Sequence, residues 1–135
     1  MTAVTTSAIR TTEDRLRTVL RVDAGVTGAV GLFALVGPTS SYGDTPGWLP
    51  RVLGLAFLAF AVELALQARS SGSRLRLVGQ ITAEAALAWT VATVAILALV
   101  DLPTAGREVL ALVGLGTLGF GITELRLVRS LSAAV

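Results

Sequence analysis

The chain has 135 residues, of which 53% are hydrophobic and 15% are charged, and its mean hydropathy is +0.77. Soluble domains carry about 25% charged residues, so this composition excludes an ordinary water-soluble domain and predicts a membrane protein. The chain has no Cys and no His, which excludes a disulfide, a Cys nucleophile and the usual zinc and haem ligands. We therefore expect a protein that is not an enzyme, with no catalytic residue, no metal site and no cofactor.

All 11 basic residues are Arg, and the formal net charge is +2. The Arg residues flank apolar segments instead of forming a soluble basic patch, so we expect no nucleic-acid partner. Anionic membrane lipids are the expected counter-ions. The absence of Lys and the abundance of Ala, Val, Leu and Gly are typical of a GC-rich bacterial genome.

The N-terminal residues 1–11 are small, polar and without periodicity, which predicts a flexible tail. Thr11, with Asp14 three residues later, has the pattern of a capping box, so we expect the first helix to begin near Thr12. An apolar stretch over 20–37 predicts the first membrane span. A signal peptide also has a basic start and an apolar core, but here a turn rich in Pro and Gly follows, with no cleavage site.

Three further apolar segments predict membrane spans over residues 48–68, 77–100 and 109–128. The fold class is therefore all-α: one transmembrane domain over residues 1–135, built as a four-transmembrane-helix bundle. Nine Arg residues fall on the side of the membrane that holds both termini, and two fall on the other. The positive-inside rule then predicts cytosolic N- and C-termini in a bacterial inner (plasma) membrane.

The two predicted helical hairpins resemble each other. An offset of 61 residues aligns Asp23 with Glu84 and Glu63 with Glu124. A duplicated helical hairpin would give a pseudo-twofold axis along the membrane normal. Elsewhere the identity is low, so two unrelated hairpins remain the alternative.

Each span carries one carboxylate near the side that holds the termini: Asp23, Glu63, Glu84 and Glu124. Their neighbours at helical spacing are small or weakly polar, as in Thr27, and small residues mark close helix contacts in membranes. We therefore expect the four carboxylates to form a cluster inside the bundle. Two amides stand one helical turn away on the same faces, Gln67 beside Glu63 and Gln80 beside Glu84.

An ionisable group at mid-span costs about 2.5–3.5 kcal/mol on the insertion scale, so the cluster requires compensation. One interpretation is a ring of ion pairs with Arg side chains that also contact lipid headgroups. The other is a vestibule open to the cytosol that holds a proton, a hard metal cation or an amine. The Arg residues in question are Arg17, Arg21, Arg69, Arg74, Arg76, Arg126 and Arg129.

Glycines of the first and fourth spans are interpreted as close-packing faces. Trp89, within the third span, is interpreted as a packing residue or a lipid contact in preference to part of a quinone or pigment site.

The pattern D-A-x-x-T-G-x-x-G-L occurs in the first span and resembles a group of small actinobacterial four-span membrane proteins of unknown function. Its residues are Asp23, Ala24, Thr27, Gly28, Gly31 and Leu32. The layout is also similar to the DoxX-like four-helix class, some of whose members are accessory subunits of membrane oxidoreductases. The resemblance implies a four-helix bundle and carries no catalytic residue across.

Three functions fit these features. The first is a non-enzymatic accessory or scaffold subunit that packs against a larger membrane complex or forms a homo-oligomer. The second is a cation- or proton-coupled transporter or binding protein that uses the carboxylates. The third is a lipid or quinone binding protein, for which the diagnostic feature would be an apolar groove beside Trp89.

Overall fold

A computed structural model describes residues 3–133 of the chain, and this part is almost entirely helical. Four α-helices are each long and apolar enough to cross a membrane, which confirms the predicted four-helix bundle. The elements in chain order are α1 (Ala3–Val36), the short 3₁₀ helix η1 (Thr39–Tyr42), α2 (Trp48–Gln67), α3 (Gly72–Leu99) and α4 (Thr104–Ala133).

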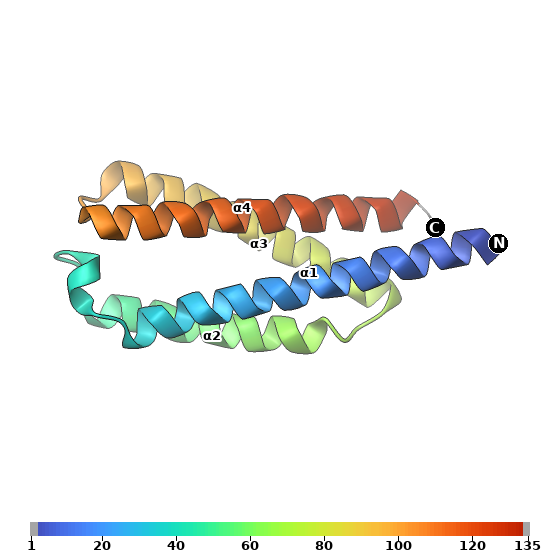
Figure 1. Ribbon diagram of the computed structural model, residues 1–135, viewed down its shortest axis with the longest axis horizontal. Helices are drawn as coiled ribbons and strands as arrows, with labels where there is room; N and C mark the ends of the chain where they lie inside the picture. Colours follow the sequence, from blue (N-terminus) through green and yellow to red (C-terminus); the bar gives the residue numbers. More distant parts are fainter. Residues whose placement is uncertain (1–2, 134–135) are drawn as a thin grey trace.

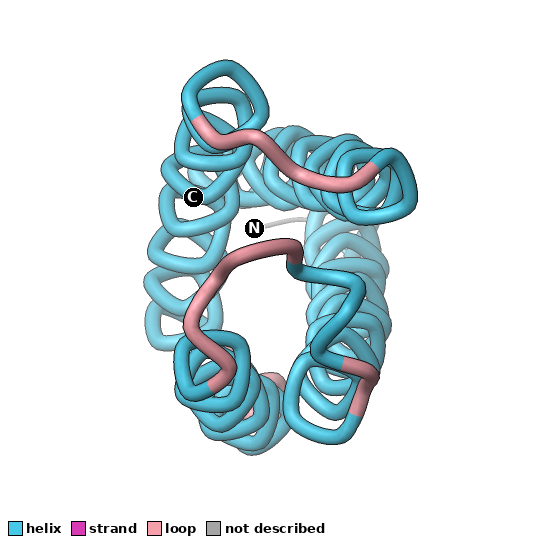
Figure 2. The backbone as a smooth tube through the Cα atoms, turned by 90° about the vertical axis from the view of Figure 1, so that its left-hand side faces the viewer, coloured by secondary structure: helices cyan, strands magenta, loops and turns pink. Residues whose placement is uncertain are grey.

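The helices are arranged as two antiparallel hairpins, α1 with α2 and α3 with α4 (Figure 1). The hairpins meet mainly through α1 and α4, whereas the backbones of α2 and α3 approach each other at few positions. Viewed along the bundle, the connection that contains η1 lies across one end (Figure 2). We call this the loop end, and the opposite end, where both termini lie, the terminal end (Figure 1).

The first helix starts earlier than predicted. It already includes Ala3, so the predicted tail is wrong for residues 3–11, while residues 1–2 lie outside the described part. The hydroxyls of Thr11 and Thr12 donate to the carbonyls four residues earlier, each at 3.0 Å, as in a helix interior. At 1.5 Å per residue, the 34 residues of α1 span about 51 Å, which exceeds the hydrocarbon thickness of about 30 Å.

The terminal end is held together by a compact apolar core. Leu16, Leu20 and Leu75 are fully buried there, and Leu64 and Leu131 pack with them. These residues come from all four helices, so this core joins the two hairpins.

Polar contacts add a second link between α1 and the connection from α2 to α3. Arg17 Nε donates to the carbonyl of Ser70 at 3.2 Å, and the amide of Gly72 donates to Glu13 Oε1 at 3.2 Å. The N-terminal turns of α1 therefore run alongside and beyond this connection.

Glycine allows close helix contact within each hairpin, as predicted. A Cβ added at Gly54 would lie 2.6 Å from the carbonyl oxygen of Gly31, and one added at Gly114 would lie 2.7 Å from Thr93 Cγ2. The prediction is wrong for three other glycines, since a Cβ on Gly25, Gly116 or Gly119 would meet nothing within 4 Å.

The two hairpins cross at nearly equivalent places. The offset of 61 residues carries Gly31 and Gly54 to positions 92 and 115, each one residue from the close pair Thr93 and Gly114. The contacts between the two hairpins are not equivalent. The contact between α1 and α4 is much more extensive than the contact between α2 and α3. The similarity is therefore one of hairpin geometry, not of the whole bundle.

Candidate functional site

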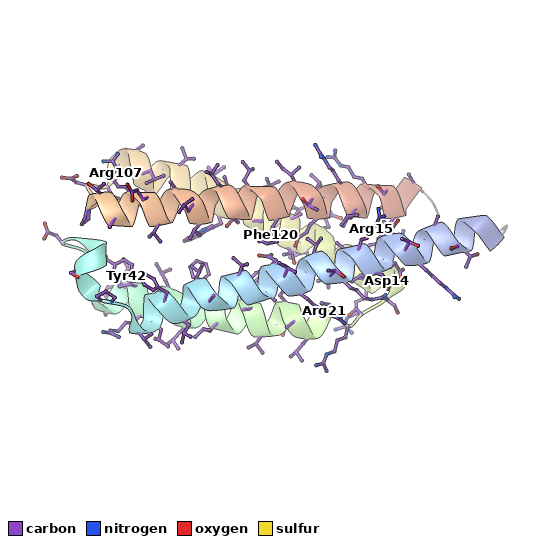
Figure 3. All side chains as sticks on the ribbon, in the orientation of Figure 1. Asp14, Arg15, Arg21, Tyr42, Arg107 and Phe120 are labelled. Atoms are coloured by element: carbon purple, nitrogen blue, oxygen red, sulfur yellow. The ribbon has the colours of Figure 1, made fainter. Side chains whose placement is uncertain are left out.

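A cavity of about 510 Å³ lies between the two hairpins. All four helices contribute to its wall, and most of the lining side chains are apolar. Phe120 of α4, which is one of them, lies near the middle of the bundle (Figure 3). The principal lining residues are Asp23, Val26 and Thr27 of α1, Ala56, Phe57 and Phe60 of α2, Thr82, Ala86 and Trp89 of α3, and Leu112, Gly116, Thr117 and Phe120 of α4.

A second cavity, of about 340 Å³, continues toward the loop end. Its wall shares Val30, Phe57, Trp89 and Val113 with the first cavity. The rings of Phe57 and Trp89 meet edge to face at a centroid distance of 4.9 Å. This aromatic pair therefore belongs to the wall that the two apolar cavities share.

Tyr42 of η1 lines the second cavity at the loop end (Figure 3). Its hydroxyl is buried and has no hydrogen-bond partner. Burial disfavours the charged phenolate, and it therefore raises the pKa of Tyr42.

Several side chains that line the first cavity keep a large exposed surface. Val26 is 46% exposed, Phe60 is 38% exposed and Leu112 is 70% exposed. These residues belong to α1, α2 and α4, at the height where the hairpins separate. The cavity is therefore partly open to its surroundings and not enclosed.

One carboxyl group lines the end of this cavity that faces the termini, and a second lies one helical turn beyond the cavity wall. Asp23 lines the cavity, is 6% exposed and accepts a hydrogen bond from Thr27 Oγ1 at 3.1 Å. Glu124 is fully buried, and neither of its carboxyl oxygens has a hydrogen-bond partner. The two groups are close enough to interact electrostatically. We refer to Asp23 and Glu124 as the buried acidic pair.

The predicted cluster of four carboxylates is wrong in two of its members, because Glu63 and Glu84 are exposed. The small residues of α2 and α3 occupy both faces of each helix: Ala59, one turn from Glu63, is exposed, whereas Ala61 is buried. A stripe of small residues therefore could not show which face of these helices is buried.

The predicted amide partners are confirmed. Gln67 Nε2 donates to Glu63 Oε1 at 2.7 Å, and Gln80 Nε2 donates to Glu84 Oε1 at 2.9 Å. Arg74 Nε in turn donates to Gln67 Oε1 at 3.2 Å. Each exposed Glu is thus paired with an amide of its own helix.

The predicted ring of ion pairs does not form around the span carboxylates. Within residues 3–133, Arg17 pairs with Glu13 at 3.2 Å and with Asp14 at 2.7 Å. No Arg in this part of the chain forms an ion pair with any of the four span carboxylates. Arg21, Arg69, Arg126 and Arg129 are exposed and Arg76 is partly exposed, so their predicted contact with lipid headgroups stays a prediction.

A metal site built from the predicted cluster is also not formed. In the described part of the chain, no three carboxylates are close enough together to hold a metal ion. The arrangement that remains is a pair of buried carboxyl groups at one end of an apolar cavity.

Most residues of the cavity wall were not predicted from the sequence. Phe57, Phe60, Phe120 and Tyr42 were not predicted as site residues. Of the residues singled out in the sequence, Asp23, Thr27 and Trp89 do line the first cavity. Residues that face lipid and residues that fill the core are also apolar. The sequence therefore does not distinguish the residues of the cavity wall from these two groups.

No protein-family model, no curated protein and no solved structure matches this chain. These comparisons therefore do not support the resemblance to actinobacterial or DoxX-like proteins. The fold and the site define a small four-span membrane protein with a partly open apolar cavity between its two hairpins.

Proposed function

We propose that the protein is a non-enzymatic, lipid-embedded binding protein that holds an elongated apolar molecule of the membrane phase inside its helix bundle. The observation that carries this proposal is the partly open cavity of about 510 Å³, whose wall is mostly apolar and comes from all four helices. Its volume falls within the range of about 300–1,000 Å³ found for ligand pockets.

The distribution of polar atoms favours an amphiphile. The apolar wall continues past Phe57 and Trp89 into the second cavity, while one carboxyl group, Asp23, lines the opposite end of the first. The polar group of the ligand would then lie at Asp23, and its chain would run toward the loop end. With nine of 11 Arg residues at the terminal end, we place this end at the cytosolic face of a bacterial plasma membrane.

Tryptophan fluorescence tests the proposal. The chain has two Trp residues, so Trp48→Phe leaves Trp89 as the single reporter beside the cavity. In phosphatidylcholine nanodiscs, brominated dodecanol should quench Trp89 in a saturable manner. Gly116→Phe, which adds a ring at a cavity-lining position, should remove the saturable phase.

Gly119→Phe is the matched control. Gly116 and Gly119 lie on the same helix, and a Cβ at either meets no atom within 4 Å, but only Gly116 lines the cavity. Gly119→Phe should keep the saturable quenching. Quenching that rises linearly with brominated dodecanol in all three proteins would contradict the proposal.

A second candidate function is an accessory subunit, which the exposed Gln80–Glu84 pair favours. Polar groups on a lipid-facing surface are costly, and a larger membrane complex or a second copy of the chain would cover them. A photo-crosslinking residue at position 84 should then form a protein adduct in membranes, whereas one at Val91, which is 70% exposed, should react with lipid. Lipid adducts alone at both positions would exclude this candidate.

A further inference from the structure

We infer that the buried acidic pair binds a protonated amine, so that the ligand of the cavity is a cationic amphiphile. This inference rests on the proposed function and adds the chemical class of the polar group. It is carried by the combination of a cavity that ends at Asp23 and a fully buried Glu124 whose two oxygens have no partner.

The free acceptors of the pair match the donors of an ammonium group. Asp23 Oδ1 already accepts from Thr27, but both oxygens of Glu124 are unpartnered. Buried polar atoms without a partner are rare and costly in folded proteins. An alkylammonium has three N–H donors and no acceptor, so it would supply both donors and a compensating charge.

The position of Glu124 relative to the cavity fits the same ligand. Glu124 lies one helical turn from Phe120, which lines the cavity, and Asp23 lies one turn from Thr27, which also lines it. An ammonium at Asp23 would therefore be near both carboxyl groups. Its alkyl chain would extend along the apolar wall toward Phe57 and Trp89.

Other charged ligands fit less well. Hard divalent cations take about six to eight oxygen ligands, and the described residues place no third carboxylate beside the pair. No Arg between residues 3 and 133 forms an ion pair with Asp23 or Glu124. An anionic headgroup would meet charge of its own sign.

Three probes of equal chain length separate the inference from the function on which it rests. Brominated dodecylamine, dodecanol and dodecanoate are titrated at pH 7 against Trp48→Phe protein in phosphatidylcholine nanodiscs, and affinities are expressed per mole fraction of probe in the bilayer. We expect the amine to bind at least about tenfold more tightly than the alcohol, which corresponds to about 1.4 kcal/mol. The dodecanoate should bind most weakly.

Neutral variants of the pair test its role. Asp23→Asn retains an acceptor for Thr27, and Glu124→Gln retains the shape of the side chain. Each should reduce the preference for amine over alcohol to less than about threefold. Saturable quenching of Trp89 by the alcohol, whatever its affinity, shows that the variant is folded. Glu63→Gln, at an exposed carboxylate paired with Gln67, is the matched control and should keep the full preference.

The outcomes distinguish the two claims. Saturable binding of the alcohol with an equal affinity for the amine would overturn the inference and leave the proposed function intact. A preference for the amine that persists in Asp23→Asn and Glu124→Gln would do the same. Failure of every probe to quench Trp89 in a saturable manner would overturn both. Loss of the preference in the two neutral variants alone would support the inference.

Discussion

Glu124 is the residue whose position is hardest to explain by stability alone. It is fully buried near the apolar core of the terminal end, and neither carboxyl oxygen has a partner. A buried polar group left unsatisfied costs about 1–3 kcal/mol. A residue that lowers the stability of the free protein in this way is typical of a binding site.

Replacing Glu124 by Met should therefore stabilise the ligand-free protein by about 1–3 kcal/mol, since Met has a similar shape and no polar oxygen to satisfy. Chemical unfolding in mild detergent would measure the change. A lower free energy of unfolding for Glu124→Met than for the original protein would show that Glu124 has a stabilising partner.

Tyr42 gives a test at alkaline pH. It is the only Tyr in the chain, and burial raises its pKa, so the tyrosinate absorbance of the folded protein should titrate above the usual value near 10. In the unfolded protein it should titrate near that value. Because the unfolded state then loses the proton first, the contribution of Tyr42 to stability is present below about pH 10 and decreases as the pH rises through the higher folded pKa. Equal midpoints in the two states would show that the hydroxyl is exposed.

At the scale of the elements, the contact between α1 and α2 depends on glycine. A Cβ at Gly54 would lie 2.6 Å from Gly31 O and 2.7 Å from the amide nitrogen of Leu35, and backbone atoms cannot move aside as a flexible side chain can. Gly54→Ala should therefore destabilise the protein by about 1–3 kcal/mol, as overpacking does.

Gly119→Ala is the control for this substitution, because it makes the same change where no atom lies within 4 Å. The higher helix propensity of Ala should leave its stability equal to the original or up to about 1 kcal/mol greater. Thermal unfolding of both variants in the same detergent provides the comparison. Equal effects at positions 54 and 119 would show that α1 and α2 are not in close contact there.

The four helices could be predicted from the sequence, but several of their ends and faces could not. Long apolar runs require a helix in a membrane, because every backbone group must be paired. The tail over residues 3–11 was mispredicted because Thr11 and Thr12 suit a cap and a helix interior almost equally. Ala59 and Ala61 show why Glu63 was placed on the wrong face: when small residues surround a helix, the buried face depends on its neighbours.

At the scale of the whole molecule, the charge asymmetry predicts the orientation in the membrane. Both termini lie at one end (Figure 1), and only Arg51 and Arg107 belong to the other. A fluorescent protein fused after Val135 should therefore fluoresce in the cytosol of a bacterial host, whereas the same protein inserted after Asp44 should not. The opposite pattern would reverse the orientation and place the acidic pair at the outer face.

The cavity is also a property of the whole molecule, which is why the sequence did not predict it. It exists because the hairpins pack closely at Leu16, Leu20 and Leu131 but separate toward the loop end. That separation depends on how the hairpins cross. The buried acidic pair was predicted in part. Asp23 and Glu124 were expected in the interior, but Glu63 and Glu84 were expected beside them and are exposed.

Native mass spectrometry of the protein released from nanodiscs measures directly whether the cavity holds an amphiphile. After incubation with dodecanol or dodecylamine, the original protein and Gly119→Phe should each retain one bound amphiphile per chain, and Gly116→Phe should retain none. Equal retention by Gly116→Phe and Gly119→Phe, or no retention by any of the three, would contradict the account.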